Sequence, residues 1–457
     1  MFTPSAKLVP LGAVSRPPPP SSRIESIPYE TLMHIMQFTV FDPGPPYNTL
    51  FAALRLSHVS RHFRFVAHGA SELWTLICPN FPLADDQVQF WLEVLARSKA
   101  RLLNVVINVQ VEILGATQPY STFLEAVVNH SDRWRKFEIT SKVWEPIGLF
   151  LDHSRRLVLL PRLEELTLHH SDDPGRTANR EEVSAPRFHN ILFGKDVVAP
   201  KLNIVKLGAT YFDHSSIRSI AKDLVELHFE NHTYPRTSDV PEMIIDLLRA
   251  SPRLQVLTLT SVNLQFDNFP SPVELRYLRK LEFRGLPRNV VLLSLVRVPA
   301  LEVLYLGECR FAAGPGSAVL PSLFTAELTL RALIGFFTSP ENSRWYWRAG
   351  GLRELSLEYT HCSVAREAKR FLRLTVNVET LRTSCSAILP ILANHPEILP
   401  NLQHLVVKSS IFYDWDLFSV ILTNRPDVTF SVEGDLTPDG ERLYNTLKGT
   451  HNITLCP

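Results

Sequence analysis

The sequence is poor in several features that would each mark a class of protein. Its 457 residues include only 18 glycines and five cysteines, and 47 Lys plus Arg stand against 46 Asp plus Glu, for a formal net charge of +1. So little glycine excludes a collagen-like chain. Five widely spaced cysteines without a C-x-x-C pair argue against a disulfide scaffold or a zinc ribbon. A balanced charge leaves no surplus of cations for nucleic acid or an anionic membrane, so we expect neither as a partner.

Long apolar runs are missing as well. The best candidate, VVLLSLV at residues 290–296, is far shorter than the roughly 18 apolar residues that a membrane-spanning helix needs. The amino terminus shows no basic patch followed by an apolar stretch, which a secretory signal would require. Together with the cysteine usage, these absences predict an intracellular protein of the cytoplasm, the nucleus or both.

Proline, by contrast, is abundant, with 34 residues. Four consecutive prolines at 17–20 cannot be helical, and they predict a disordered leader over residues 1–23. The other prolines stand apart in a chain that is 45% hydrophobic and 20% charged, which leaves ample apolar material for a large core. Such spacing is typical of repeated punctuation between short elements.

A repeat fills most of the chain after residue 85. The pattern L-x-x-L-x-L, with conservative replacements, occurs for example at Leu163/Leu166/Leu168 and at Leu352/Leu355/Leu357. The first positions run from residue 102 to residue 402, and their average interval of about 27 residues falls within the range of leucine-rich repeats. Six units open with Pro-x-Leu, at prolines 161, 200, 252, 299, 321 and 400. The two regularities are independent, and both indicate a repeat array.

The spacing also predicts how the repeats fold. A short strand carries the inner leucines, and neighbouring strands form a parallel ladder. The segments before several strands have helical periodicity, as at residues 85–100 and 241–251, and we expect them to pack on the back of the ladder. No unit buries its apolar face alone, so we expect one contiguous solenoid over residues 85–430, followed by a cap or tail at 431–457.

The segment 24–77 follows a different rule. Leu32, Ile35 and Met36 stand at helical spacing, and a second stripe continues after a Pro/Gly break with Leu54, Val59, Phe63 and Val66. Two or three short amphipathic helices in about fifty residues make a marginal core. We therefore expect this unit to lean on a partner or on the repeats.

This segment resembles an F-box. The family pattern of Leu-Pro-x-Glu-Leu-x-x-x-Ile, then Leu-x-x-Val-Cys-(Lys/Arg)-x-Trp and a closing Leu-Trp, is matched by Ile27, Pro28, Glu30, Ile35, Leu56, Val59, Arg61, Leu73 and Trp74. Ser60 replaces the family's Cys, and Phe63 replaces its Trp. The whole chain resembles fungal F-box proteins with leucine-rich-repeat-like carboxyl halves.

The resemblance implies an α/β protein in which a short all-α F-box precedes an irregular leucine-rich-repeat solenoid. It also implies docking on a Skp-type adaptor, and through it on a cullin, so that the chain would be a non-catalytic substrate receptor of an SCF-type ubiquitin ligase. The adaptor would contact an apolar helical surface, for which we name Ile27, Pro28, Leu32, Ile35, Leu54, Val59 and Phe63.

The repeats would hold the target protein. Residues between the inner leucines project from the ladder, where they mix charges of both signs with two tyrosines, a composition that suits a protein partner. The candidate target-binding residues are His228, Lys280, Arg284, Tyr305, Glu358 and Tyr359.

Two alternatives stay open. The first is an adaptor-independent interaction scaffold with a drifted F-box, favoured by Phe63 and by a long loop between the first helices. The second is an enzyme or metal protein, based on the pair His58 and His62 or on the cluster of residues 169–173. No nucleotide-binding or nucleophile motif accompanies these histidines, and Cys309 occupies a turn position of the repeat. We therefore expect no catalytic, cofactor-binding or metal-binding residues.

Overall fold

The structure is a computed structural model of the chain. It describes residues 27–40, 46–110, 117–171, 192–194, 196–209, 217, 220–230, 239–262, 271–284, 292, 295–307, 334, 351–358, 365–385, 387–408, 415–434, 436, 438–449 and 453–456. The leader predicted at 1–23 lies outside these residues. Two compact units are present. Unit 1 holds the described residues up to 171 together with 192–206, 217 and 220, and unit 2 holds 207–209 and everything from 221 onward.

Unit 1 begins with α1 (Tyr29–Val40), α2 (Pro46–Ser57), α3 (Arg61–Gly69) and the 3₁₀ turn η1 (Ser71–Trp74). Ser60 starts α3: its backbone is extended and its side chain accepts a hydrogen bond from the Phe63 N–H at 3.2 Å. This is an ordinary N-cap, which contributes about 1 kcal/mol to a helix. The departure of Ser60 from the F-box pattern therefore has a local structural role.

Trp74 contacts both α3 and the helix that precedes the first long strand. Its side chain is fully buried, and its indole Nε1 donates a hydrogen bond to the Ala67 carbonyl at 2.7 Å. The guanidinium of Arg97, at the end of α4 (Asp85–Arg97), lies 4.9 Å from the centre of the indole ring. The side chain of Trp74 thus joins α3 and α4 within unit 1.

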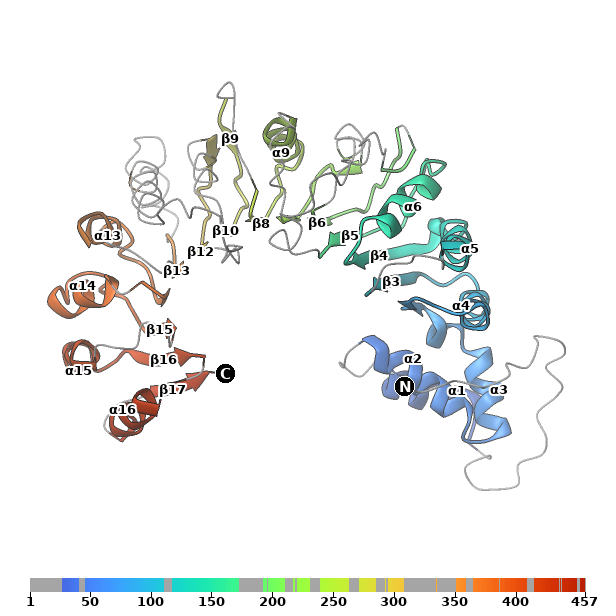
Figure 1. The fold of residues 1–457 in the computed structure, drawn as a ribbon, viewed down its shortest axis with the longest axis horizontal. Helices are drawn as coiled ribbons and strands as arrows, with labels where there is room; N and C mark the ends of the chain where they lie inside the picture. The colour runs from blue at the N-terminus through green and yellow to red at the C-terminus, as the bar shows by residue number, and fades with distance from the viewer. Residues whose placement is uncertain are drawn as a thin grey trace, which may run out of the picture. The chain divides into compact units, whose positions relative to one another are not determined.

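The strands of unit 1 form a parallel ladder. Both β1 (Leu76–Ile77) and β2 (Asn80–Phe81) pair with β3 (Leu103–Val109), which pairs with β4 (Trp134–Ser141), and β5 (Glu165–His170) and β6 (Ile204–Gly208) follow in that order. The helices α4, α5 (Thr117–Val128) and α6 (Glu145–Ser154) lie along one side of these strands (Figure 1). The interior is aromatic, with Phe137 stacked between Trp134 and Phe150 at ring distances of 4.3 and 4.6 Å.

Unit 2 continues the same rule with nine strands in sequence order. They are β7 (Glu226–Glu230), β8 (Val256–Thr260), β10 (Lys280–Arg284), β12 (Val303–Gly307), β13 (Glu354–Glu358), β14 (Thr380–Thr383), β15 (His404–Lys408), β16 (Thr429–Glu433) and β17 (Ile453–Cys456). Each pairs with the next in parallel, so equivalent leucines line up: Leu257, Leu281 and Leu304 are direct partners. A two-stranded sheet of β9 (Val273–Glu274) and β11 (Val296–Arg297) lies apart from the ladder.

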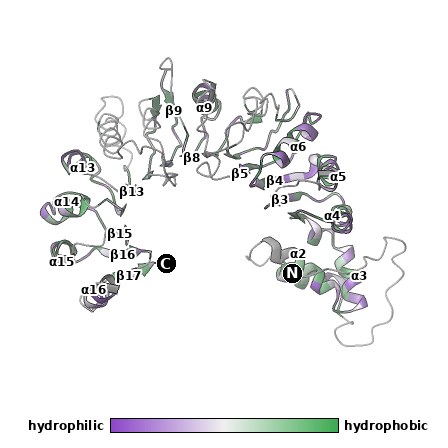
Figure 2. Cartoon of the chain, viewed as in Figure 1, coloured by the Kyte–Doolittle hydropathy of each residue, from purple (hydrophilic) through white to green (hydrophobic). Residues whose placement is uncertain are grey.

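Helices cover one side of this second ladder. They are α9 (Asp239–Ala250), α13 (Ala365–Leu372), α14 (Ile388–Asn394), α15 (Trp415–Asn424) and α16 (Pro438–Lys448), and they lie on the outer side of the strands in Figure 1. Of these helices, α13 is clearly amphipathic. It carries hydrophilic and hydrophobic residues (Figure 2), and Ala368, Phe371 and Leu372 are the buried ones.

The predicted α/β fold class, a parallel strand ladder with helices on its back, is confirmed. The inner leucines that defined the repeat are core residues: Leu163, Leu166 and Leu168 are fully buried, as are Leu254, Leu257 and Leu259. Burying one such side chain contributes roughly 1.5–3 kcal/mol, which is the force that holds each unit against its neighbours. The ladder also continues beyond residue 430, because β17 pairs with β16 inside the segment predicted as a cap or tail.

Candidate functional site

The first candidate surface is apolar and lies on the helices of unit 1. Ile35 and Phe38, three residues apart in α1, are 46% and 82% exposed, while Phe51 in α2 and Val59 after it are 56% and 58% exposed. Within the described part of the chain these are four of eleven exposed large hydrophobic side chains, gathered in 25 residues. Exposed apolar side chains that lie so close in the sequence favour a protein-binding surface more than scattered ones do. We call these four residues the apolar helix face.

The structure separates the predicted adaptor-binding residues. Ile35 and Val59 belong to the apolar helix face, and Pro28 is exposed. Three are half-buried, namely Ile27, Leu54 and Phe63. Leu32 is fully buried, so its assignment to a contact surface is corrected to a core role.

The reason is helical periodicity. Leu32, Met36 and Val40 recur every four residues in α1 and face the interior of the helical unit, whereas Ile35 and Phe38 share a different face. Two of the three residues in the predicted apolar stripe, Leu32 and Met36, are core residues. Phe38 and Phe51 were not predicted as contact residues, although Phe38 stands three residues after Ile35 and therefore on the same side of the helix.

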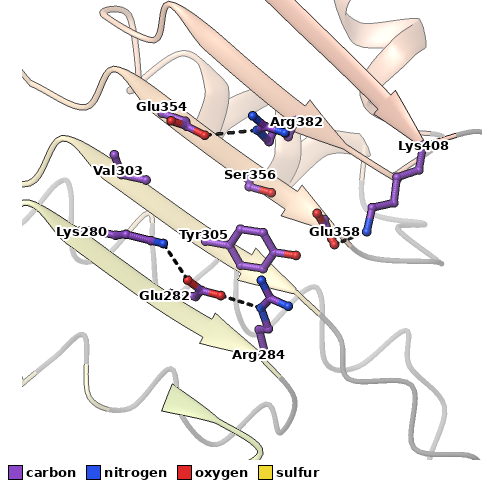
Figure 3. Close-up of a pocket in the computed structure, with 10 residues that line it drawn as sticks. All are labelled: Lys280, Glu282, Arg284, Val303, Tyr305, Glu354, Ser356, Glu358, Arg382 and Lys408. Carbon is purple, nitrogen blue, oxygen red and sulfur yellow. Dashed lines mark hydrogen bonds and ion pairs between the residues drawn. The ribbon is translucent and has the colours of Figure 1, made fainter. Parts of the chain in front are cut away.

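The second candidate surface is a pocket on the strands of unit 2. It has a volume of about 510 Å³ and is open to solvent on the ladder face (Figure 3). Its lining comes from five neighbouring strands, β10 to β15, and comprises Lys280, Glu282, Arg284, Val303, Tyr305, Glu354, Ser356, Glu358, Arg382 and Lys408. We call it the ladder pocket.

Four of the six predicted target-binding residues meet in the ladder pocket: Lys280, Arg284, Tyr305 and Glu358. His228 is two strands away, in the same row as Glu282, and its Nε2 lies 3.5 Å from Glu226 Oε2. Tyr359 lies outside the described residues. Arg382 and Lys408 were not among the predicted residues, although Arg382 stands at the repeat position of Tyr305 and Lys408 at that of Glu358.

Glu282 anchors one end of the pocket. Lys280 Nζ lies 3.1 Å from its Oε2, and Arg284 Nε donates to its Oε1 at 2.6 Å. All three side chains come from alternate positions of β10, so they project from the same face of the ladder.

Tyr305 links this end of the pocket to the next strands. The Arg284 guanidinium lies 4.4 Å from the ring centre of Tyr305, a cation–π contact. A Cβ on Gly307 would come within 2.8 Å of Tyr305 Cε1, so the missing side chain at 307 makes room for the ring. Burial and the hydrogen bond to Glu358 raise the pKa of the Tyr305 phenol. The phenol therefore stays protonated and donates to the Glu358 carboxylate, which Lys408 also contacts.

Arg382 closes the other end of the pocket. Its Nε donates to Glu354 Oε1 at 3.2 Å and its Nη1 donates to Glu433 Oε1 at 2.6 Å. One cation between two carboxylates makes this end the negative one.

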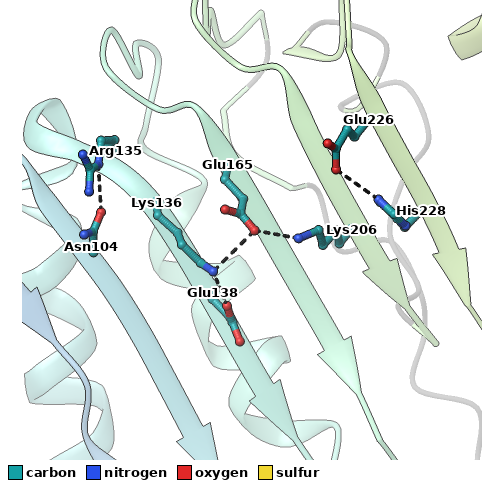
Figure 4. Close-up of polar contacts among 8 residues, drawn as sticks. All are labelled: Asn104, Arg135, Lys136, Glu138, Glu165, Lys206, Glu226 and His228. Carbon is teal, nitrogen blue, oxygen red and sulfur yellow. Dashed lines mark hydrogen bonds and ion pairs between the residues drawn. The ribbon is translucent and has the colours of Figure 1, made fainter. Parts of the chain in front are cut away.

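Unit 1 carries a simpler charge network on its strands (Figure 4). Lys136 Nζ lies 2.9 Å from Glu138 Oε2 and 3.4 Å from Glu165 Oε1, and Lys206 Nζ lies 2.9 Å from the same oxygen. Burial acts to raise the pKa of Glu165, but the hydrogen bond from Lys206 and the charge of Lys136 outweigh it and hold that pKa below its usual value. Two cations and two carboxylates balance here.

The described residues show neither a cluster of metal ligands nor a helix that could cross a membrane. They contain no group of three or more His, Cys, Asp or Glu placed to hold a metal ion. His62 Nε2 lies 3.2 Å from the Ile27 carbonyl oxygen, while Asp172, Asp173 and Cys309 fall outside the described part of the chain. Within the same part, every helix is too short or too polar to cross a membrane.

Comparison with known proteins gives likenesses among solved structures alone. No protein-family model matches the sequence, and no curated protein matches it. Among solved structures, one that is similar is described as the crystal structure of the Rad7 and Elc1 complex in yeast. The alignment covers 93% of this chain and 92% of that chain at 13% sequence identity, with a TM-score of 0.35. A score this low does not establish a shared fold.

Proposed function

We propose that this protein is a non-catalytic substrate-recruiting subunit of a cullin-RING ubiquitin ligase of the SCF type. The helices of unit 1 dock on a Skp-type adaptor, which connects them to a cullin, and the repeats bind the target protein. The observation that carries the proposal is the apolar helix face, Ile35, Phe38, Phe51 and Val59, on the segment that resembles an F-box. These side chains are 46–82% exposed.

The energetics favour a partner on this face. Apolar surface removed from water contributes about 25 cal/mol per Å², and aromatic anchors at the centre of an interface can each contribute about 2 kcal/mol or more. Phe38 and Phe51 are such aromatic groups, and the stripe of Leu32, Met36 and Val40 behind them is buried and holds α1 in place. A partner can therefore bind to a face that is already formed.

The scaffold alternative uses the same repeats without an adaptor. Its support is Phe63, which stands at the Trp position of the F-box pattern and is half-buried in α3. Binding of a Skp-type adaptor distinguishes the two functions, because only the ligase subunit requires it.

The test is titration calorimetry of the full chain with a Skp-type adaptor. We expect binding at micromolar concentration or tighter. Replacing Ile35 and Phe38 together by alanine should weaken it about a hundredfold or more, if both are interface anchors. Tyr277→Ala is the matched control, because Tyr277 is a 58% exposed aromatic of unit 2. Absence of adaptor binding by the unaltered protein at micromolar concentration would reject the ligase function and favour the scaffold.

A further inference from the structure

The ladder pocket presents more positive charge than its residue content suggests. Its four cationic side chains are 40–46% exposed, namely Lys280, Arg284, Arg382 and Lys408. Glu282 and Glu358, which pair with three of them, are only 9% and 17% exposed. Glu282 and Glu358 therefore lie beneath the cations that they contact, so at this part of the pocket an entering molecule meets ammonium and guanidinium groups first. Glu354, at 38% exposed, lies level with Arg382 at the other end.

Hydrogen-bond donors remain available after these internal contacts. Arg284 uses its Nε for Glu282, and neither of its Nη groups bonds to a described residue. Lys280 and Lys408 each form one ion pair, although an ammonium group has three donors. Ser356 is 2% exposed, and its Oγ has no hydrogen-bond partner among the described residues. A buried hydroxyl without a partner is unfavourable, and an acceptor supplied by a ligand would remove that cost.

We propose that the ladder pocket binds an acidic, carboxylate-bearing segment of the target protein. The inference rests on the proposed function in one respect, that the ladder face holds a target. The two Nη groups of Arg284 match the two oxygens of one carboxylate, and Lys408 can pair with a neighbouring one. Ser356 donates to a ligand oxygen deeper in the pocket. The ring of Tyr305 supplies apolar surface for the methylene groups of a Glu side chain.

The charge arrangement favours carboxylates over phosphates. The lining holds four cations and three carboxylates, a surplus of one, and Arg382 is enclosed between Glu354 and Glu433. A phosphorylated side chain carries a charge of about −1.5 to −2 in a single group, so Glu354 and Glu358 would repel it more strongly. Single charges distributed along a peptide can instead pair with separate cations and stay away from the negative end.

The probes are three short fluorescent peptides of equal length: one rich in Glu, one with Gln in place of every Glu, and one with phosphoserines that give the same total charge. Binding to the full chain is measured by fluorescence anisotropy at low and at high salt. We expect the Glu peptide to bind about tenfold more tightly than the Gln peptide, and salt to weaken only the former. Arg284→Glu should weaken the Glu peptide about tenfold or more.

The control for charge reversal is Arg276→Glu, since Arg276 is 71% exposed and forms its ion pair with Glu274, which lies outside the ladder. It should leave the affinity unchanged. Ser356→Ala tests the interior of the pocket: we expect an affinity loss of about threefold or more without a lower unfolding midpoint, because the lost hydroxyl has no internal partner. If Ser356 had only a structural role, Ser356→Ala would lower the unfolding midpoint and leave the affinity for the Glu peptide unchanged.

Three results would overturn the inference: equal binding of the Glu and Gln peptides, a Glu-peptide affinity that Arg284→Glu does not change, or a phosphoserine peptide that binds about tenfold more tightly at equal charge. The adaptor is titrated into the same preparations. If the full chain binds the adaptor but not the acidic peptide, this inference is rejected and the proposed function stands. If it binds the acidic peptide but not the adaptor, the proposed function is rejected.

Discussion

The two ladders use the same positions between buried leucines, yet their charged faces differ. In unit 1, Lys136 and Lys206 share Glu165, and Glu138 takes the other contact of Lys136. Direct pairs between neighbouring side chains neutralise one another there. In unit 2 the carboxylate of Glu282 lies beneath its cations, and the pocket contains a buried hydroxyl with no described partner.

An aromatic ring makes the difference. Tyr305 lies in the space that Gly307 leaves open, contacts Arg284 through its ring and donates to Glu358, so it connects these two charged groups. In the network of unit 1, every contact is a direct ion pair. The strands of both ladders carry charged residues, and in unit 2 the ring of Tyr305 contacts two of them, Arg284 and Glu358.

The largest expected effect tests whether the two ladders share one kind of core. Leu166→Ala in unit 1 and Leu281→Ala in unit 2 each remove a fully buried side chain. We expect each substitution to lower the free energy of unfolding by about 2–5 kcal/mol, because a cavity remains in a packed strand row. Hydrogen exchange of the full chain would report each unit separately. A loss well below 1 kcal/mol for one of them would mean that its ladder is not packed as described.

A smaller effect tests the role of the ring. Gly307→Ala forces a Cβ to within 2.8 Å of Tyr305 Cε1, and overpacking of this kind costs about 1–3 kcal/mol. The control is Gly148→Ala in α6 of unit 1, where the nearest heavy atom, Trp144 Nε1, lies at 3.5 Å. Since alanine is the better helix former by about 1 kcal/mol, that change should be neutral or stabilising. Combining Gly307→Ala with Tyr305→Ala should recover part of the lost free energy of unfolding, because the clashing ring is removed. No recovery would mean that the cost of Gly307→Ala does not come from contact with the Tyr305 ring.

The smallest effect concerns pH and is confined to the helices of unit 1. Burial first, and then the charges of Arg97 and Arg64, lower the pKa of His68 to about 4, while an unfolded histidine titrates near 6.5. Between these values the unfolded chain binds more protons, so stability should fall as the pH drops from about 6.5 to about 4 and stay level above that window. His68→Gln should flatten this dependence, as measured by urea unfolding across the pH range. An unchanged slope would assign the effect to other groups.

Much of the architecture followed from the sequence. The interval of about 27 residues and the L-x-x-L-x-L pattern predicted parallel strands whose leucines face inward, and Leu166, Leu257 and Leu355 are fully buried. Helical spacing likewise predicted the helices within residues 24–77 and the helix α4. These features depend on local periodicity, which decides which residues share a face of an element, and that information is contained in the order of residues alone.

Tertiary packing decided the rest. Periodicity placed Leu32 and Ile35 in one amphipathic segment, but the packing of α1 in unit 1 buried the first and left the second exposed. The ladder pocket likewise joins residues from 280 to 408, because parallel pairing brings three adjacent rows of five successive strands side by side. Burial of Glu282 beneath Lys280 and Arg284 has no counterpart in sequence spacing. Solvent exposure and distances between strands are properties of the packed chain, so the sequence could supply the candidates for each surface, while only the folded ladder could select among them.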